Sequence, residues 1–377
     1  MDGTGQRLTL GLPKIHNEPG EVRDFHPGIV RVALGTGAEV LIESGYGSGL
    51  AHIDQDYLID PGRIRLVDRE EALTADVVLM LRPSDDAFDH LRAGSTLVSM
   101  LHFPTHKERA QRLKELGVEA VALDLIVDDE GIRLVENMRA VAWNGMDVGF
   151  KVLERRLGSF RDRDEPPRAF ILGAGAVGKH AVEAATKFGN VDRAEALACS
   201  CARAPGVEAV TAGRNLTSNE TYMRARLPSA DVLVDATCRH DPSRPLVPNA
   251  WLDLLPKHAV IVDLSVDPYL LDEDPPVVRG IEGIPAGTLD GYVFGPSDPA
   301  WDEIPDRVPH AHRRWVVSCY SWPGIDPVGC MHHYGHQLEP LLEALLRRHG
   351  AGHLRPDGPY LERALHRGSL AAWLPHI

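Results

Sequence analysis

The chain has 377 residues, of which 44% are hydrophobic and 25% charged, a composition typical of a folded globular protein with room for two domains. Its formal net charge of −14 comes without any basic block, which argues against nucleic acid or an anionic membrane as the main partner. The 5 cysteines include no C-x-x-C pair, and neither a signal peptide nor a membrane-spanning apolar stretch is recognisable, so we expect a cytoplasmic protein without disulfides or structural metal.

Apolar strands alternate with helices over the first third of the chain. Uninterrupted apolar runs, such as residues 75–81, are typical of strands that are buried on both faces of a parallel sheet. The pattern therefore predicts an α/β domain here. The expected strands are residues 8–13, 38–43, 75–81, 96–101 and 118–126, and the expected helices are residues 27–34 and 105–116.

A second α/β domain is predicted after residues 136–157, whose helical periodicity without proline indicates a helix that crosses from one domain to the next. The expected later strands are residues 168–172, 194–199, 231–235, 259–264 and 315–319, and a helix over 336–349 is expected to return to the first domain. We therefore predict two Rossmann-like domains with parallel sheets, a cleft between them and a long crossing helix. The substrate domain comprises residues 1–135 and 325–377, and the NAD(P)-binding domain comprises residues 136–324.

The most informative motif is the glycine-rich sequence at residues 173–178, which follows the strand at 168–172 and begins a helix. In a G-x-G-x-x-G turn the first glycine permits the tight turn, the second lets backbone N–H groups approach a pyrophosphate, and the third lets the helix pack on the strand. A glycine turn that binds nothing is the alternative. The predicted cofactor contacts are Gly173, Gly175, Ala176, Val177 and Gly178.

Four polar side chains stand where open parallel sheets bind their ligands, beyond the carboxyl ends of strands. Arg82 and His102 each follow a buried strand of the first domain. Asp267 follows a buried strand of the second domain, and Arg23 lies in the loop after the first strand of the chain. We expect these side chains to face one another across a cleft, with a nicotinamide between them.

These residues resemble the alanine dehydrogenase and saccharopine dehydrogenase superfamily, which is related to the N-terminal part of transhydrogenase. The likeness is one of order and motif over most of residues 8–345, and the Glu21-x-Arg23 loop and residues 320–324 look closer to the saccharopine branch. The resemblance implies that NAD(H) or NADP(H) binds between two Rossmann-like domains, and that an amino acid or substituted amine is interconverted with a keto acid through an imine. The matching segments are residues 18–23, 43–49 with Asp54 and Tyr57, 101–102, 173–178 and 262–267.

The resemblance also implies roles for single residues: Arg23 pairs with the substrate carboxylate, His102 is the catalytic histidine, and Asp267 lies beside the nicotinamide and the substrate. The residue types suit these roles, because a guanidinium clamps a carboxylate with two hydrogen bonds and an imidazole exchanges protons near neutral pH. Each residue also has a structural alternative: a surface arginine, a histidine satisfied at a strand end, or an aspartate that caps the turn before Pro268.

Arg82 departs from the family, which usually has a lysine acting as acid–base or polarising the carbonyl at this place. Arginine stays protonated (pKa above ~12) and cannot shuttle a proton near neutrality. Three alternatives remain: His102 works alone with water, Lys14 supplies a second group, or the chemistry has changed. Arginine also favours a second carboxylate or a keto oxygen, which indicates a dicarboxylic or opine-like substrate. The alternative function is a catalytically altered member that binds dinucleotide as a sensor or subunit.

The cofactor preference is predicted from the end of the second strand of the nucleotide domain. NAD-binding Rossmann domains usually carry Asp or Glu there, to bond the ribose hydroxyls. The expected position, residues 198–203, contains no carboxylate, and Ser200 and Arg203 could instead accept a 2′-phosphate by hydrogen bond and by charge. The pattern therefore favours NADP(H) over NAD(H).

Residues 330–336 bring a thiol and histidines close together in the sequence, as metal sites do. Cys330, His333 and His336 lack an acidic or cysteine-pair partner at the usual spacing, so we expect no metal and the start of a helix here. Taken together, the sequence predicts an NAD(P)-dependent oxidoreductase that acts on the C–N bond of an amino acid or imine. Hydride transfer occurs at the α-carbon of a small-molecule carboxylate substrate, and a homo-oligomer is compatible with the sequence.

Overall fold

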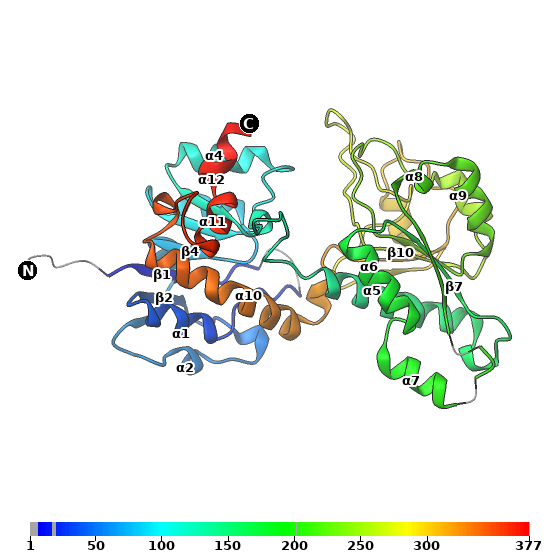
Figure 1. Ribbon diagram of the computed structural model, residues 1–377, viewed down its shortest axis with the longest axis horizontal. Coiled ribbons are helices and arrows are strands. Elements are labelled where there is room, and N and C mark those ends of the chain that lie inside the picture. Colours follow the sequence, from blue (N-terminus) through cyan, green and yellow to red (C-terminus); the bar gives the residue numbers. More distant parts are fainter. Residues whose placement is uncertain (1–6, 17–19, 201, 205, 377) are drawn as a thin grey trace, which may run out of the picture. The chain divides into compact units, whose positions relative to one another are not determined.

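The computed structural model describes residues 7–16, 20–200, 202–204 and 206–376. The chain divides into two compact units, Met1–Asn137 with Asp326–Ile377, and Met138–Ile325. Each unit consists of one sheet covered by helices, which can be followed in Figure 1. No helix of the described part is both long enough and apolar enough to cross a membrane.

The sheet of the first unit has six strands in the order β3-β2-β1-β4-β5-β6, and every printed pairing is parallel. Parallel strands are buried on both faces, which explains why β4 and β5 are fully buried and why aliphatic residues form β4 and the centre of β5. The strands are β1 (Thr9–Leu12), β2 (Glu39–Glu43), β3 (Ile64–Val67), β4 (Val77–Leu79), β5 (Thr96–Ser99) and β6 (Glu119–Ala122).

Two cores flank this sheet because successive side chains of a strand point to opposite faces. Leu10, Val40 and Val77 pack on the face that α1, α10 and α11 cover, and α1 lies beside α10 (Figure 1). Leu41 and Val78 pack on the other face against α3, α4 and α12. The helices are α1 (Gly28–Gly35), α2 (Asp54–Tyr57), α3 (Arg69–Leu73), α4 (Lys107–Glu115), α10 (Pro327–Arg347), α11 (Tyr360–Arg367) and α12 (Leu370–Trp373).

The sheet of the second unit also has six strands, in the order β11-β12-β10-β9-β7-β8. All its pairings are parallel except that of β11 with β12. The antiparallel strand at one edge leaves the parallel architecture of the other strands intact. The strands are β7 (Arg168–Leu172), β8 (Glu208–Ala212), β9 (Val232–Asp235), β10 (Val260–Asp263), β11 (Val293–Phe294) and β12 (Trp315–Ser318).

One face of the second sheet packs against α5 and α6, with Met146 and Phe150 of α5 in the core beside Ala181 of α6. The opposite face is covered by α9 and by the irregular segments around Trp301. The region predicted as a crossing helix is α5. The helices are α5 (Met138–Leu157), α6 (Ala176–Thr186), α7 (Val191–Cys199), α8 (Arg214–Thr217) and α9 (Glu220–Arg226).

The prediction of two parallel-sheet α/β domains is confirmed, but the strand expected at 194–199 is wrong. These residues form most of α7, because Asn190 caps the helix by accepting a hydrogen bond from the Arg193 N–H at 3.1 Å and the alanines that follow favour a helix. The second strand of the unit is β8. The helix expected at 336–349 begins earlier, at Pro327, where Asp326 caps the Gly329 N–H at 3.0 Å.

Each sheet has a point where the strand order reverses, and ligands of open α/β sheets bind there, beyond the carboxyl ends of the strands. In the first sheet this point lies between β1 and β4, and in the second it lies between β7 and β9. The loops that follow these four strands are therefore the first places to look for a site.

Candidate active site

In the first unit, the loops after β1 and β4 bring two arginines to one carboxylate. The Arg23 side chain is only 6% exposed, and its Nε donates to Glu21 Oε1 at 2.7 Å. Arg82 Nη1 lies 3.9 Å from the same oxygen. Two guanidinium groups thus lie close to one buried carboxylate at this switch point, and guanidinium groups are well suited to hold an anionic ligand. Residues 18 and 19 of the matching loop lie outside the described residues.

Two neutral side chains of α10 pack close to these arginines. Burial raises the pKa of the Cys330 thiol to about 11, against the nearby charge of Arg23. Burial likewise raises the pKa of the Tyr334 phenol to about 12. Both groups are therefore uncharged near neutral pH and add no negative charge beside Arg23 and Arg82.

The structure places Lys14 after β1, where its ammonium holds a neighbouring loop. Lys14 Nζ donates to the carbonyl of Gly45 at 3.1 Å and to the hydroxyl of Ser48 at 2.9 Å. The backbone N–H of Lys14 donates to Glu43 Oε2 at 2.6 Å. These contacts tie Lys14 to the glycine-rich loop after β2.

His102 follows β5 and is paired with Asp124, which sequence analysis missed. Its ring Nδ1 lies 3.4 Å from Asp124 Oδ2, and its backbone N–H donates to Asp124 Oδ1 at 3.1 Å. Burial pushes the pKa of Asp124 up, but its contacts with His102 outweigh burial and keep the pKa below its usual value. An ionised Asp124 favours the tautomer that carries hydrogen on Nδ1 and leaves Nε2 as the proton acceptor. The His102 side chain is 45% exposed, so the ring is accessible to a substrate.

Positive backbone φ angles occur at one predicted site residue, His102, and directly before another, Asp267. His102 has φ +50°, and Val266, the residue before Asp267, also has φ +50°. The left-handed region is a genuine outlier for a β-branched residue such as valine. Such strain persists only where surrounding contacts enforce it, and it clusters at functional sites. At Val266 the backbone N–H donates to Asp263 Oδ1 at 2.9 Å, which holds this conformation.

In the second unit, the glycine motif forms the turn between β7 and α6 at the switch point. A Cβ on Gly173 would lie 2.4 Å from the Ala236 carbonyl oxygen, and one on Gly178 would lie 2.2 Å from the Gly173 oxygen, so both positions require glycine. A Cβ on Gly175 would meet nothing within 4 Å. The turn therefore packs tightly beneath an open space at the start of α6, where Ala176 and Val177 begin the helix and the first N–H groups have no partner within it. These residues fit the pyrophosphate of a dinucleotide.

The prediction that Ser200 and Arg203 follow the second strand is wrong, because residues 194–199 are helical. Ser200 is the C-cap of α7, and its hydroxyl donates to the Leu197 carbonyl at 2.9 Å. Arg203 is exposed and paired with Asp164 at 2.9 Å. The residues after the actual second strand, β8, are Gly213, Arg214 and Asn215, and Arg214 and Asn215 are exposed.

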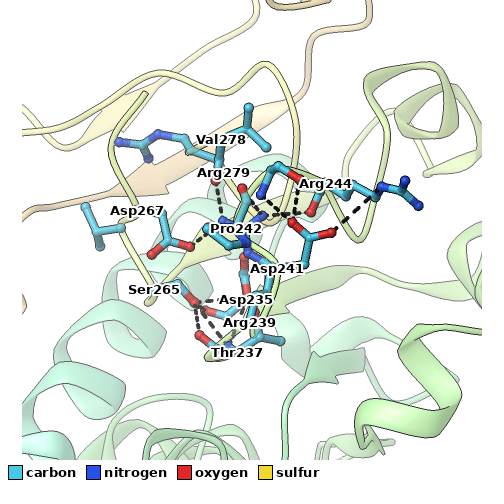
Figure 2. Close-up of polar contacts among 12 residues, drawn as sticks. Asp235, Thr237, Arg239, Asp241, Pro242, Arg244, Ser265, Asp267, Val278 and Arg279 are labelled. Atoms are coloured by element: carbon cyan, nitrogen blue, oxygen red, sulfur yellow. Dashed lines mark hydrogen bonds and ion pairs between the residues drawn. The ribbon is translucent and has the colours of Figure 1, made fainter. Parts of the chain in front are cut away.

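Asp267 lies beyond β10, but it is already engaged by a residue that sequence analysis did not identify. Arg239 Nη2 donates to Asp267 Oδ2 at 2.7 Å, and Figure 2 shows this pair among the loops that follow β9 and β10. Burial raises the pKa of Asp267, and the adjacent Arg239 opposes that effect. The Asp267 side chain is 34% exposed, so part of the carboxyl group remains accessible.

A buried aspartate holds the start of the segment that follows β9. Asp235, at the end of β9, accepts hydrogen bonds from the Thr237 hydroxyl at 2.7 Å and from the Ser265 hydroxyl at 3.0 Å (Figure 2). Burial, with the Asp263 carboxylate nearby, raises the pKa of Asp235 to about 6. The segment after β9 thus contacts both the glycine turn and the strained segment before Asp267.

The histidines of residues 330–336 make two separate contacts. His332 and His336 approach each other, with their Nε2 atoms 3.2 Å apart, whereas His333 Nε2 lies 2.8 Å from the Glu136 carbonyl oxygen. His26 and His52 complete a histidine-lined hollow of ≈ 460 Å³. Within the described ranges, no three His, Cys, Asp or Glu side chains are arranged to hold a metal ion.

Each of the three missed residues, Asp124, Arg214 and Arg239, follows the carboxyl end of a strand. Asp124 stands beyond β6, the neighbour of β5, and would have been found had the strand been ended at Ala122. Arg214 follows β8 and would have been found had that strand been recognised. Arg239 follows β9, which was predicted, just as Asp267 follows β10, so the strand-end rule also applies to it, although its contacts depend on the irregular course of the loop in which it lies.

The comparisons with known proteins agree with this architecture. Residues 19–142 match the alanine dehydrogenase/PNT N-terminal domain, and residues 159–268 match the alanine dehydrogenase/PNT C-terminal domain. The chain is 26% identical to the alanine dehydrogenase of Bacillus subtilis over 278 residues, which are 69% of this chain and 71% of that protein. It is 24% identical to the alanine dehydrogenase of Methanococcus maripaludis over 273 residues, which are 69% of this chain and 72% of that protein.

Solved structures show the same fold. An L-alanine dehydrogenase superposes with a TM-score of 0.70 at 22% identity, covering 96% of this chain and 94% of that one. The transhydrogenase from Sinorhizobium meliloti superposes with a TM-score of 0.58 at 20% identity, covering 90% of this chain and 95% of that one. With both domains matched in order, the chain belongs to the alanine dehydrogenase/PNT family.

Proposed function

We propose that the protein is an NAD(P)-dependent dehydrogenase that acts on the C–N bond of an amino acid or an amino-acid-derived imine. The observation that carries the proposal is the glycine turn at the switch point of the second sheet, with open space at Gly175 above a closely packed Gly173 and Gly178. The family of the chain and the arginines at the other switch point support it.

The residues of the first unit bind the substrate and move its proton. Arg23, with Arg82 beside it, holds the substrate carboxylate by charge and by paired hydrogen bonds. His102 accepts or donates a proton through Nε2, at the substrate nitrogen or at its water, while Asp124 keeps Nδ1 protonated. Because Arg82 cannot release a proton near neutral pH, His102 is the acid–base group of this mechanism.

The residues of the second unit hold the cofactor. The N–H groups at the start of α6 bind the pyrophosphate, and Asp267 lies by the nicotinamide or the substrate cation. When bound, the nicotinamide supplies the hydride donor or acceptor at C4. For hydride to pass, the substrate held by the first unit must reach the nicotinamide held by the second.

Arg82 indicates which class of substrate the site accepts. An arginine at position 82 favours a second carboxylate or a keto oxygen over a bare methyl group, and this supports a dicarboxylic or opine-like substrate of the kind that saccharopine-type chemistry uses. Such a substrate is larger than alanine and carries an anionic group for each guanidinium.

The test combines binding with turnover. The purified chain is titrated with NADPH and NADH by nucleotide fluorescence, then offered pyruvate, 2-oxoglutarate and glyoxylate with ammonia, lysine or other amines. We expect cofactor oxidation with at least one pair, fastest with a dicarboxylic partner. Tight binding without turnover for every pair would favour a dinucleotide sensor or subunit, which the arginine at position 82 also permits. Absence of binding would refute both.

Cofactor preference gives a separate prediction, because Arg214 is the second residue after β8 and no carboxylate is present at 213–215. We propose NADP(H) as the cofactor, with the Arg214 guanidinium on the 2′-phosphate. Arg214→Ser should weaken NADPH binding about 10–100-fold, the value of a charge-assisted hydrogen bond of about 1.5–3 kcal/mol, and leave NADH binding nearly unchanged.

The matched control is Arg203→Ser, which removes an exposed arginine that is paired with Asp164. Its NADPH affinity should equal that of the wild type in the same fluorescence titration. An equal loss of NADPH and NADH binding in Arg214→Ser, or a selective loss of NADPH binding in Arg203→Ser, would contradict the assignment of the 2′-phosphate to Arg214.

A further inference from the structure

The guanidinium of Arg239 is fixed independently of Asp267. Its Nη1 donates to the carbonyls of Arg244 at 2.8 Å and Pro242 at 3.3 Å, and its Nη2 also donates to the carbonyl of Val278. The side chain is only 5% exposed, and Figure 2 shows it among the loops that supply these contacts. Three backbone acceptors from two chain segments would hold the arginine in place even without the carboxylate.

Asp267 has no comparable support. Besides Arg239, the charged groups that act on it are Asp263 and Arg279. Arg279 is buried and already donates to Asp263 at 2.5 Å and to the Ser318 hydroxyl at 3.1 Å. A half-buried carboxylate beside a second carboxylate is disfavoured in its charged form, so its charge depends on the remaining cation.

We propose that Arg239 is the positioning residue of Asp267: its pre-fixed guanidinium holds that carboxylate ionised and in one orientation beside the dinucleotide-binding turn. The inference rests on the proposed function, in which Asp267 lies by the nicotinamide or the substrate cation. The new element is that Arg239, on another loop, maintains the negative charge of Asp267. Arg239 itself contacts neither cofactor nor substrate.

The orphaned Nε of Arg239 agrees with this role. Within the part of the chain that the structure describes, this buried nitrogen has no hydrogen-bond partner. Burying an unsatisfied donor is unfavourable, and a residue that only tied loops together could be replaced without that penalty. The guanidinium carries this cost and donates to Asp267 through Nη2.

The variants Arg239→Gln, Arg239→Lys, Asp267→Asn and the double variant Arg239→Gln/Asp267→Asn separate this role from a purely structural one. In Arg239→Gln the acidic limb of the kcat/KM profile should move upward by about one to three pH units, because an opposite charge at such a distance is worth that much to a carboxyl group. Arg239→Lys keeps the charge and should leave the limb near its wild-type position. Adding Arg239→Gln to Asp267→Asn should cause no further loss of kcat/KM.

A purely structural clamp predicts other results. Equal losses in Arg239→Gln and Arg239→Lys without movement of the acidic limb, or additive losses in the double variant, would overturn the proposal. The proposal would also be overturned if Asp267→Asn lowered the melting temperature as much as Arg239→Lys does. That result would mean that Asp267 holds the arginine in place, and not the reverse. This last comparison decides the matter even where Arg239→Gln does not fold.

A carboxyl-carbon NMR titration of the full chain requires no turnover. The Asp267 signal is identified by its loss in Asp267→Asn, and its midpoint should rise in Arg239→Gln but not in Arg239→Lys. A rise in a protein that turns over no substrate would support the link between these two residues while the proposed function fails. An unchanged midpoint in Arg239→Gln would overturn the inference and leave the proposed function standing.

Discussion

Gly175→Val is expected to abolish dinucleotide binding while the protein stays folded. A Cβ at position 175 would meet no heavy atom within 4 Å, so the side chain enters open space. The backbone there has φ −76° and ψ −161°, an extended conformation that valine adopts readily. The same space is where a pyrophosphate must approach the N–H groups of α6, and valine would keep it away.

The expected loss is at least roughly 100-fold in affinity, because two charge-assisted hydrogen bonds of about 1.5–3 kcal/mol each are displaced. Nucleotide fluorescence measures the affinity, and a thermal unfolding curve shows whether the fold is unchanged. Undiminished NADPH and NADH binding to a folded Gly175→Val protein would place the pyrophosphate elsewhere and remove the main support of the proposed function.

Gly178→Ala is the matched control, since it should lose binding for a different reason. Its Cβ would lie 2.2 Å from the backbone oxygen of Gly173, and backbone cannot move aside cheaply. We expect destabilisation of about 1–3 kcal/mol, as for an overpacked core. The contrast between the two variants distinguishes a glycine needed for packing from a glycine needed for a ligand.

Buried strands were predictable from sequence, including the edge strand β6 within the expected 118–126, whereas the more exposed edge strands β3 and β8 were not. The strands β4, β5, β9 and β10 are buried throughout and centre on consecutive aliphatic residues, with polar residues only at the ends of β5, β9 and β10. β3 and β8 stand at the edges of their sheets, and half or more of their side chains are partly exposed. The apolar pattern is therefore lost in β3 and β8. Residues 194–199 of the alanine-rich α7 form a mostly apolar run that predicts a strand in place of β8.

The difference between recognisable and unrecognisable strands also explains which site residues could be predicted. Arg23, Arg82 and His102 follow recognisable strands, so the strand-end rule identified them. Arg214 follows an unrecognised edge strand. Arg239 follows the recognisable strand β9, but its partners at residues 242, 244 and 278 could not be predicted because only irregular backbone brings them together. Periodicity carries no information about such loops.

Asp124→Asn and His102→Gln test the acid–base chemistry, and the larger loss is expected for His102→Gln. Removing a positioned general acid–base costs about 10²–10⁴-fold in kcat. Asp124→Asn should cost at least about tenfold, because an amide that donates towards Nδ1 stabilises the wrong tautomer and occupies Nε2 with hydrogen. Steady-state kinetics with the substrate pair from the panel measures both losses. His106→Gln, which removes an exposed histidine 2.9 Å from Glu108, should be neutral.

Stability against pH gives a second measure of the His102–Asp124 pair that does not depend on turnover. The folded pKa of Asp124 lies below its ordinary value, so the folded state binds fewer protons there than the unfolded state. The stabilisation is therefore complete above the unfolded pKa of about 3.9 and is lost as the pH falls through the folded value. Asp124→Asn should accordingly be less stable than the wild type at pH 7, with the gap closing in strong acid. A gap that stayed constant with pH would mean that Asp124 supports the loop by packing and not by its charge, and the tautomer argument for His102 would lose its basis.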